Sequence, residues 1–413
     1  MRRAECFSPR QRRPYCRSFT PQFDHQPRCF RMNRRRALLL LALPLGGWLG
    51  QRLVWPTPRH QRGISLRALL GDSAEFAEFS RAISKRDFKF PIDHAPHPEF
   101  RHEWWYFTGN LETATKRPFG FQLTFFRLAL TARPRLSLSG WRGNQLLLGH
   151  FAITDVQAQH FHADERQHRS ALEIAGTSTA PPSVWIKNWK VAITDGENHD
   201  WRLTAQTETH GLALDLISIK APILQGDRGL SQKGNAVGNA SYYYSQPRLN
   251  ASGALTLAGV DYPVTGTAWV DREWGSGALE VAQEGWDWFG LQFTNYSELM
   301  FYRLRRTDST PDPHSSGIWI DPDGKGVALN HTEVSLSCLD TWTSPNTGVR
   351  YPQRWRIDIP KLHMRLAITP RVAAQEWRGR VVYWEGAVEV SGTSNQAALT
   401  GVGYAEFTGY LAR

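Results

Sequence analysis

The residues best suited to chemistry are one acid and a set of aromatic rings on two predicted strands. Alternate residues of a strand share a face, so Trp269 and Asp271 point the same way, as do Tyr242 and Tyr244. Burial in an apolar cavity raises the pKa of a carboxyl group until it can donate a proton near neutral pH, and ring faces stabilise a carbocation. This pattern predicts acid-catalysed hydration or isomerisation of a C=C bond. A structural ion pair between Asp271 and Arg272 is the alternative.

A second polar cluster precedes an earlier predicted strand. Residues 93–103 hold three histidines and three carboxylates, but two prolines interrupt them and their spacing matches no fixed ligand pattern. An ion pair at the start of the strand is therefore favoured, and no metal is expected. His102 shares a strand face with Trp104 and Tyr106 and is a candidate for orienting water. The residues expected to line an aromatic ligand pocket stand at alternate positions of two strands: Trp104, Tyr106, Trp286 and Trp288.

A glycine-rich loop leads into Tyr242. Residues 224–239 lack the Gly-Lys-Ser/Thr ending of a phosphate loop and are followed by a strand pattern, so we expect a lid or rim over a site. The chain also lacks a Gly-x-Ser-x-Gly motif. A hydrolase is consequently the weakest of the enzyme classes considered.

Short alternating runs of residues dominate from Phe88 onward, bounded by Gly, Pro, Asn and Asp. Many short strands without helices between them predict an all-β fold of antiparallel barrels or sandwiches. Residues 265–271 (TGTAWVD) and 400–406 (TGVGYAE) resemble each other, which indicates two related β domains in tandem. We place the first at 88–275 and the second at 276–413, joined at a Gly-Ser-Gly segment.

Composition and charge exclude several classes of function. The 413 residues include 17 Trp, 12 Tyr and 20 Phe, a load that suits a cavity walled by rings. The net charge is +11, but residues 1–36 hold eleven Arg and two acids, or +9, which leaves +2 for the rest. A basic groove is therefore unsupported, and no nucleic-acid partner is expected.

The N-terminal region has the sequence pattern of an export segment. Three arginines precede a short apolar run, so residues 32–50 are predicted to be a signal peptide or an anchor. Met32 directly precedes this pattern, and residues 1–31 form a basic extension that a start at Met32 would leave untranslated. Residues 51–87 are expected to be a linker with a short helix. The predicted location is periplasmic, or anchored on the outer side of the inner membrane through residues 34–49 if the segment is uncleaved.

The body of the chain resembles the carotenoid 1,2-hydratase (hydroxyneurosporene synthase)-like family, and more narrowly its branch of secreted lipocalin-like proteins called secreted hydrolases. The resemblance covers about residues 88–413. It is carried by the Trp-rich blocks at 93–97 (DHAPH), 103–111 (EWWYFTGNL), 225–227 (QGD), 239–245 (NASYYYS), 268–274 (AWVDREW) and 285–289 (GWDWF). It implies two lipocalin-like β-barrel domains, with the site in the cavity of the first barrel.

The resemblance also implies a chemistry without metal or redox cofactor. Asp271 matches the family acid, Trp269 stands where the family has a Tyr, and Tyr242 and Tyr244 take the places of its His-x-Trp pair. These departures favour an apolar, isoprenoid-like or lipid ligand more firmly than carotenoid hydration itself. A non-catalytic periplasmic lipid carrier or chaperone associated with a transport system is the alternative function.

Overall fold

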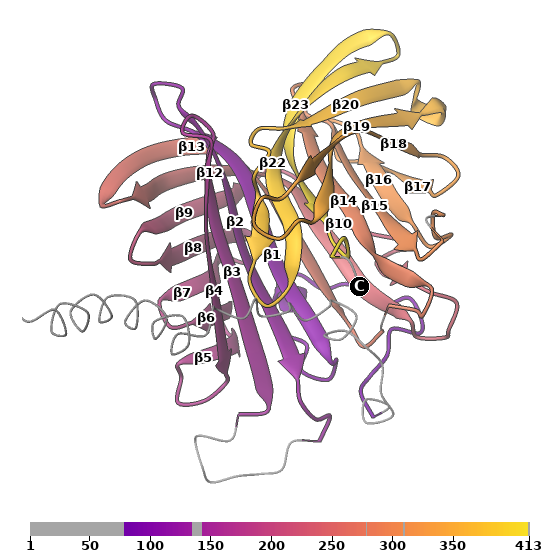
Figure 1. Cartoon of the computed structure of the whole chain (residues 1–413). Helices are drawn as coiled ribbons and strands as arrows, with labels where there is room; N and C mark the ends of the chain where they lie inside the picture. Colours follow the sequence, from indigo (N-terminus) through magenta and orange to yellow (C-terminus); the bar gives the residue numbers. More distant parts are fainter. Residues whose placement is uncertain (1–77, 134–142, 278, 309, 412–413) are drawn as a thin grey trace, which may run out of the picture. The chain divides into compact units, whose positions relative to one another are not determined.

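The computed structural model describes residues 78–133, 143–277, 279–308 and 310–411. They form two large antiparallel sheets that belong to one compact unit of the chain, Arg62–Arg413 (Figure 1). Helix among them is limited to two short 3-10 turns, η2 (Ile92–His94) and η3 (Pro360–Leu362). The predicted all-β fold with two barrel-like sheets is confirmed.

The first sheet has thirteen strands in the order β4-β3-β2-β1-β13-β12-β9-β8-β7-β6-β5, with β10 and β11 also paired to β12. The two ends of this order approach each other, because β4 contacts β5 and β6. The strands are β1 (His102–Glu112), β2 (Pro118–Ala129), β3 (Gln145–Asp155), β4 (His160–Arg169), β5 (Ala175–Thr179), β6 (Pro182–Ile186), β7 (Trp189–Asp195), β8 (Asp200–Gln206), β9 (His210–Ser218), β10 (Ile223–Leu224), β11 (Leu230–Gln232), β12 (Ala240–Leu257) and β13 (Val260–Gly275).

The second sheet has ten strands in the order β17-β16-β15-β14-β23-β22-β20-β19-β18, with β21 also paired to β22. The chain passes from one sheet to the other between Gly275 and Gln283. The strands are β14 (Gln283–Phe293), β15 (Glu298–Arg306), β16 (Ser316–Ile320), β17 (Gly326–Asn330), β18 (Ser335–Thr343), β19 (Arg350–Ile359), β20 (Met364–Pro370), β21 (Glu376–Arg378), β22 (Val382–Ser394) and β23 (Ala397–Phe407).

The predicted export segment at 32–50, the extension at 1–31 and most of the linker at 51–87 lie outside the described residues. Within the part of the chain that the structure describes, no helix combines the length and apolar character needed to cross a bilayer.

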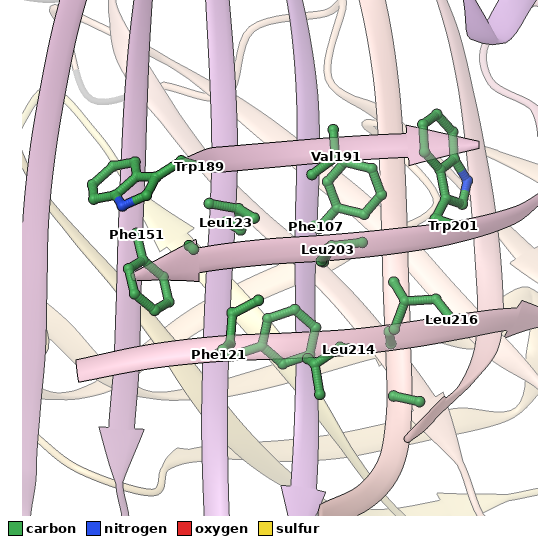
Figure 2. Close-up of a cluster of buried hydrophobic side chains, with 14 of the residues drawn as sticks. Phe107, Phe121, Leu123, Phe151, Trp189, Val191, Trp201, Leu203, Leu214 and Leu216 are labelled. Atoms are coloured by element: carbon green, nitrogen blue, oxygen red, sulfur yellow. The ribbon is translucent and has the colours of Figure 1, made fainter. Parts of the chain in front are cut away.

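The first barrel is filled by its own side chains. Alternate residues of a strand point to one face, and those of β1, β2 and β3 meet the inward residues of β7, β8 and β9 (Figure 2). Phe107, Phe121, Trp201 and Leu203 are among the side chains with no exposed surface. The stability of this barrel therefore comes from a closely packed aromatic and aliphatic core.

We expect the Leu203→Ala variant to lose about 2–5 kcal/mol of unfolding free energy, because the surrounding side chains can only partly fill the resulting cavity. Ile217→Ala on β9 is the matched control, since Ile217 is 52% exposed and its truncation leaves no buried void. Urea denaturation of both variants measures the difference. Equal losses would contradict a packed barrel interior.

The repeated sequence motif lies in equivalent strands, β13 and β23. Each strand follows a two-residue turn whose two residues both have positive φ, Ala258-Gly259 in one case and Asn395-Gln396 in the other. Such turns match the twist of a hairpin. Each strand then runs between the first strand of its sheet and the strand that precedes it in sequence. Asp271 and Glu406, which end the two motifs, consequently occupy corresponding positions in the two sheets.

Candidate functional site

A cavity of about 150 Å³ lies between the two sheets. Its walls come from β1, β2, β3, β12 and β13 of the first sheet and from β14, β15, β22 and β23 of the second. A cavity of this volume is large enough for a benzene ring. The expectation that the site lies inside the first barrel is wrong, because the inward residues fill that barrel and the outward residues of the same strands line the cavity instead.

Most of the predicted pocket residues reach this cavity. They stand at alternate positions of β1 and β14, so the aromatic rings of each strand point to the same side. The ring centres of Tyr106 and Trp288 are 5.2 Å apart, in an edge-to-face arrangement. The predicted residues that line the cavity are His102, Trp104, Tyr106, Asp271, Trp286 and Trp288. The predicted rim loop 224–239 contributes Lys233 and Asn239 to the lining.

Asp271 is held at the cavity wall by three neutral donors. Its Oδ2 accepts a hydrogen bond from the Tyr243 hydroxyl (2.6 Å), and its Oδ1 accepts from the Ser245 hydroxyl (2.5 Å) and the Trp269 indole N–H (2.8 Å). Burial raises the pKa of Asp271 to about 6, although these three hydrogen bonds act to lower it. The carboxyl group can therefore change its protonation state near neutral pH, as a proton-transfer group requires.

The ion-pair alternative for Asp271 is wrong. The Arg272 guanidinium points to the opposite face of β13, where it donates to Glu103 at 2.7 Å and to the Trp104 carbonyl, also at 2.7 Å. Among the described residues, Asp271 forms no ion pair with an arginine. Its pKa therefore reflects burial, the three neutral donors and the charge of Glu273, which adds to the rise.

The expected placement of Tyr242 and Tyr244 beside Asp271 is also wrong. The register of β12 against β13 places Ser245 opposite Asp271 and Tyr244 opposite Arg272. Directly paired residues share a face, so the odd-numbered Tyr243 lies on the side of Asp271. The Tyr244 hydroxyl instead hydrogen-bonds His94 (2.5 Å).

Tyr242 lies on this same opposite face, where its hydroxyl donates to the Ser84 carbonyl (2.9 Å) and its ring packs against Trp274. Both tyrosines belong to a separate aromatic cluster with Phe88, Phe90 and Phe100. They support the strand that carries Tyr243 and do not line the cavity.

We expect the Tyr243→Phe variant to raise the titration midpoint of Asp271 by about one pH unit. Loss of a hydrogen bond to the ionised carboxylate removes about 1.5 kcal/mol of its stabilisation, which corresponds to about one pKa unit. Tyr244→Phe, an equal change one residue along, should leave the midpoint unchanged. NMR titration of the Asp271 carboxyl carbon measures both. An equal rise in the two variants would contradict the assignment of Tyr243.

His102 lines the cavity as a neutral imidazole. Burial lowers its pKa to about 4, and its Nε2 donates to the Gly277 carbonyl (2.7 Å). That hydrogen bond leaves Nδ1 as the acceptor nitrogen, which has no partner among the described residues. His102 therefore has one lone pair free to accept a hydrogen bond.

A lysine–glutamate pair lies at another part of the wall. The Lys233 Nζ is 3.2 Å from the Glu273 Oε1 and 4.0 Å from the centre of the Tyr302 ring. Burial alone would lower the pKa of Lys233, but the Glu273 charge holds it above its usual value. Ser241 also donates to Glu273. No sequence pattern marks this pair, since its two members are far apart along the chain.

Two more carboxyl groups, Glu385 and Glu406, line the cavity from the second sheet. Glu385 is completely buried, and its Oε1 accepts a hydrogen bond from the Tyr106 hydroxyl (2.6 Å) across the two sheets. A second link between the sheets runs from the Trp288 indole N–H to the Tyr243 hydroxyl (3.2 Å). The repeated motif gave a signal for Glu406, because it aligns that residue with Asp271.

The polar cluster at 93–103 is an ionic network behind the first wall. Glu103, completely buried, lies 2.7 Å from the Arg272 Nη2 and 3.1 Å from the Arg127 Nε, and His97 bridges it to Asp93. Within the described residues, no cluster of His, Cys, Asp or Glu has an arrangement that could hold a metal ion. The network fixes the start of β1 to β2 and β13.

The chain is similar to proteins of one family over most of its length. The family model described as AttH-like matches residues 81–410. A crystal structure from Nitrosomonas europaea, assigned as an AttH, has 35% sequence identity and a TM-score of 0.71, and covers 80% of this chain and all of that one. Kievitone hydratase from Nectria haematococca shares the fold at 15% identity and a TM-score of 0.61, over 80% of this chain and 98% of that one.

A curated relative is similar over a shorter stretch. The dehydratase AsqC of Emericella nidulans is 23% identical over 165 residues, which is 37% of this chain and 44% of that protein. The similarity thus spans less than half the length of the curated dehydratase.

Proposed function

This chain belongs to the AttH-like family, and from that membership we propose that it adds water to, or removes water from, a largely apolar molecule bound between its two sheets. The observation that carries the proposal is the buried Asp271 carboxyl, held by three neutral donors at the wall of an aromatic cavity. Such a group exchanges a proton with a substrate near neutral pH without a paired arginine to fix its charge.

In the hydration direction, the Asp271 carboxyl transfers its proton to one carbon of a C=C bond, and the π electrons form the new C–H bond. The other carbon becomes a carbocation, which the faces of the cavity's aromatic rings stabilise. Water then forms a C–O bond to that carbon and releases one proton, so the product has gained one water molecule. Dehydration is the same sequence reversed, and loss of a different proton without capture of water would isomerise the bond.

The relatives support this choice of reaction. Kievitone hydratase shares the fold, and AsqC is a dehydratase by name. Addition and removal of water need the same two proton transfers, so the same side chains can catalyse hydration and dehydration. The apolar lining of the cavity favours an isoprenoid-like or other lipid-derived substrate that places one unsaturated or hydroxylated end at Asp271.

The experiment is incubation of the purified protein with geraniol, farnesol and kievitone in ¹⁸O-labelled water, followed by mass spectrometry. We expect at least one compound to gain a labelled hydroxyl group, or to exchange its own oxygen for label. Quenching of tryptophan fluorescence reports binding separately, because indoles line the cavity. Binding without label in any compound would contradict catalysis and would favour the lipid carrier instead.

We also propose export, on the basic and apolar pattern of residues 34–49. Cell fractionation of the full chain with N-terminal sequencing tests it. A protein recovered from the cytoplasm with an intact N-terminus would overturn export.

A further inference from the structure

Glu385 and Glu406 stand directly opposite each other on β22 and β23. Directly paired residues of antiparallel strands have Cβ atoms about 4.5–5.5 Å apart and share a face, and both side chains line the cavity. The Glu385 Oε1 accepts from Tyr106, whereas its buried Oε2 has no hydrogen-bond partner among the described residues. The second wall thus presents two adjacent carboxyl groups, one of which has an unused oxygen.

Neither carboxyl group has an ion pair among the described residues. Two carboxylates this close repel each other, and the pair is most stable with one proton between them. Burial raises the pKa of Glu406 to about 8, and the charges of Asp271 and Glu273 add to the rise, although a hydrogen bond from Trp286 opposes it. Burial and then the Glu406 charge raise the pKa of Glu385 well above its usual value.

The two walls differ in their supply of donors. Asp271 receives three hydrogen bonds that favour its ionised form, whereas Glu385 receives a single one among the described residues, from the Tyr106 hydroxyl. Asp271 is paired with Ser245 in the first sheet, and Glu406 is paired with Glu385 in the second. Ser245 and Glu385 therefore occupy corresponding positions in the two sheets. When their environments give two titratable groups of one site different pKa values, one group can act as an acid and the other as a base.

We propose that Glu385 and Glu406 share one proton and act together as a second proton-transfer group, on the wall that the second sheet contributes. This inference rests on the proposed function and completes its proton balance. In dehydration, the pair gives its proton to the leaving hydroxyl, the C–O bond breaks and water departs, while the Asp271 carboxylate takes the proton from the neighbouring carbon. In hydration, Asp271 protonates the carbon, and the pair accepts the proton that the added water releases. Exchange with solvent restores both groups.

Tyr106 connects the two groups. It stands opposite Asp271 in the β1–β13 register, and its hydroxyl donates to Glu385. A substrate seated against the Tyr106 ring would therefore contact both walls, one end of the reacting bond beside Asp271 and the other beside the carboxyl pair.

Infrared spectroscopy of the full chain tests the shared proton without any substrate. At neutral pH the wild type and Asp271→Asn should show the carbonyl stretch of a protonated carboxylic acid, and Glu385→Gln/Glu406→Gln should lose it. Glu389→Gln is the matched control, because Glu389 is an exposed residue of the same strand, with its side chain 62% accessible. Absence of the band from the wild type, or its full retention in the double variant, would overturn the shared proton.

Turnover tests the chemical role, with the compound that gains or exchanges label in the experiment above. Glu406→Gln should lower kcat at least about a hundredfold, as expected for loss of one general acid or base. It should leave KM nearly unchanged, and Glu389→Gln should keep the wild-type rate. Wild-type kcat in the double variant would overturn the role of the pair. If the wild type turns over no compound, the proposed function fails, while the infrared result still decides the shared proton.

Discussion

Asp271→Asn should abolish hydration and dehydration while it leaves ligand binding intact. An amide has nearly the volume of the carboxyl group and still accepts hydrogen bonds, but it cannot exchange a proton. The expected loss in kcat is about a thousandfold, within the range of about 10²–10⁴ for general acid–base catalysis. Stopped incubations with mass spectrometry measure the rate, and quenching of tryptophan fluorescence measures binding.

Asp261→Asn is the control, because Asp261 is an exposed residue of the same strand. It should behave like the wild type. The pH dependence of the wild type gives an independent check, since the pKa of Asp271 is raised by burial to about 6. Hydration needs the protonated acid and should fall as pH rises through about 6, whereas dehydration needs the carboxylate and should rise. Wild-type turnover by Asp271→Asn would refute the assignment.

The largest effect on stability is expected from Glu103→Ala. Glu103, Arg127 and Arg272 have no exposed surface, and the carboxylate is the acidic partner of both guanidinium groups. Its removal leaves buried positive charge without compensation, which costs about 3–5 kcal/mol when one partner of a buried ion pair is deleted. Urea denaturation followed by tryptophan fluorescence measures the loss.

Glu112→Ala is a matched change on the same strand, at a glutamate whose side chain is 42% exposed and pairs with Lys116 at the surface. An exposed pair of this kind contributes at most about 1 kcal/mol. If the two variants lost the same stability, the buried network would not be what fixes the start of β1.

The sequence was sufficient for the fold because barrel strands carry a period that can be read locally. Alternation along β13 correctly predicted that Trp269 and Asp271 share a face, and the two are hydrogen-bonded. The repeated motif correctly marked β13 and β23 as counterparts. These inferences need only the geometry of one strand or the comparison of two segments.

The predictions that were wrong are those that depend on how two strands pair or pack. Whether Tyr243 or Tyr244 faces Asp271 depends on the β12–β13 register, including the irregularity between Gln246 and Leu249. A change of one residue in register reverses the face of every side chain. The position of the cavity likewise depends on which face of β1 packs into the barrel. Glu385 escaped notice because its importance comes from a contact with Tyr106, 279 residues away.

Because the cavity lies between the two barrels, the residues that line it are different from those that form the barrel cores. Inward positions of β1 and β13 hold the first barrel together, while the alternate positions of the same strands line the cavity. Substitutions at the cavity wall can therefore change the shape and polarity of the cavity at little cost to either hydrophobic core. Since each sheet supplies one wall, a substitution in one sheet changes one side of the cavity and leaves the opposite side as it was.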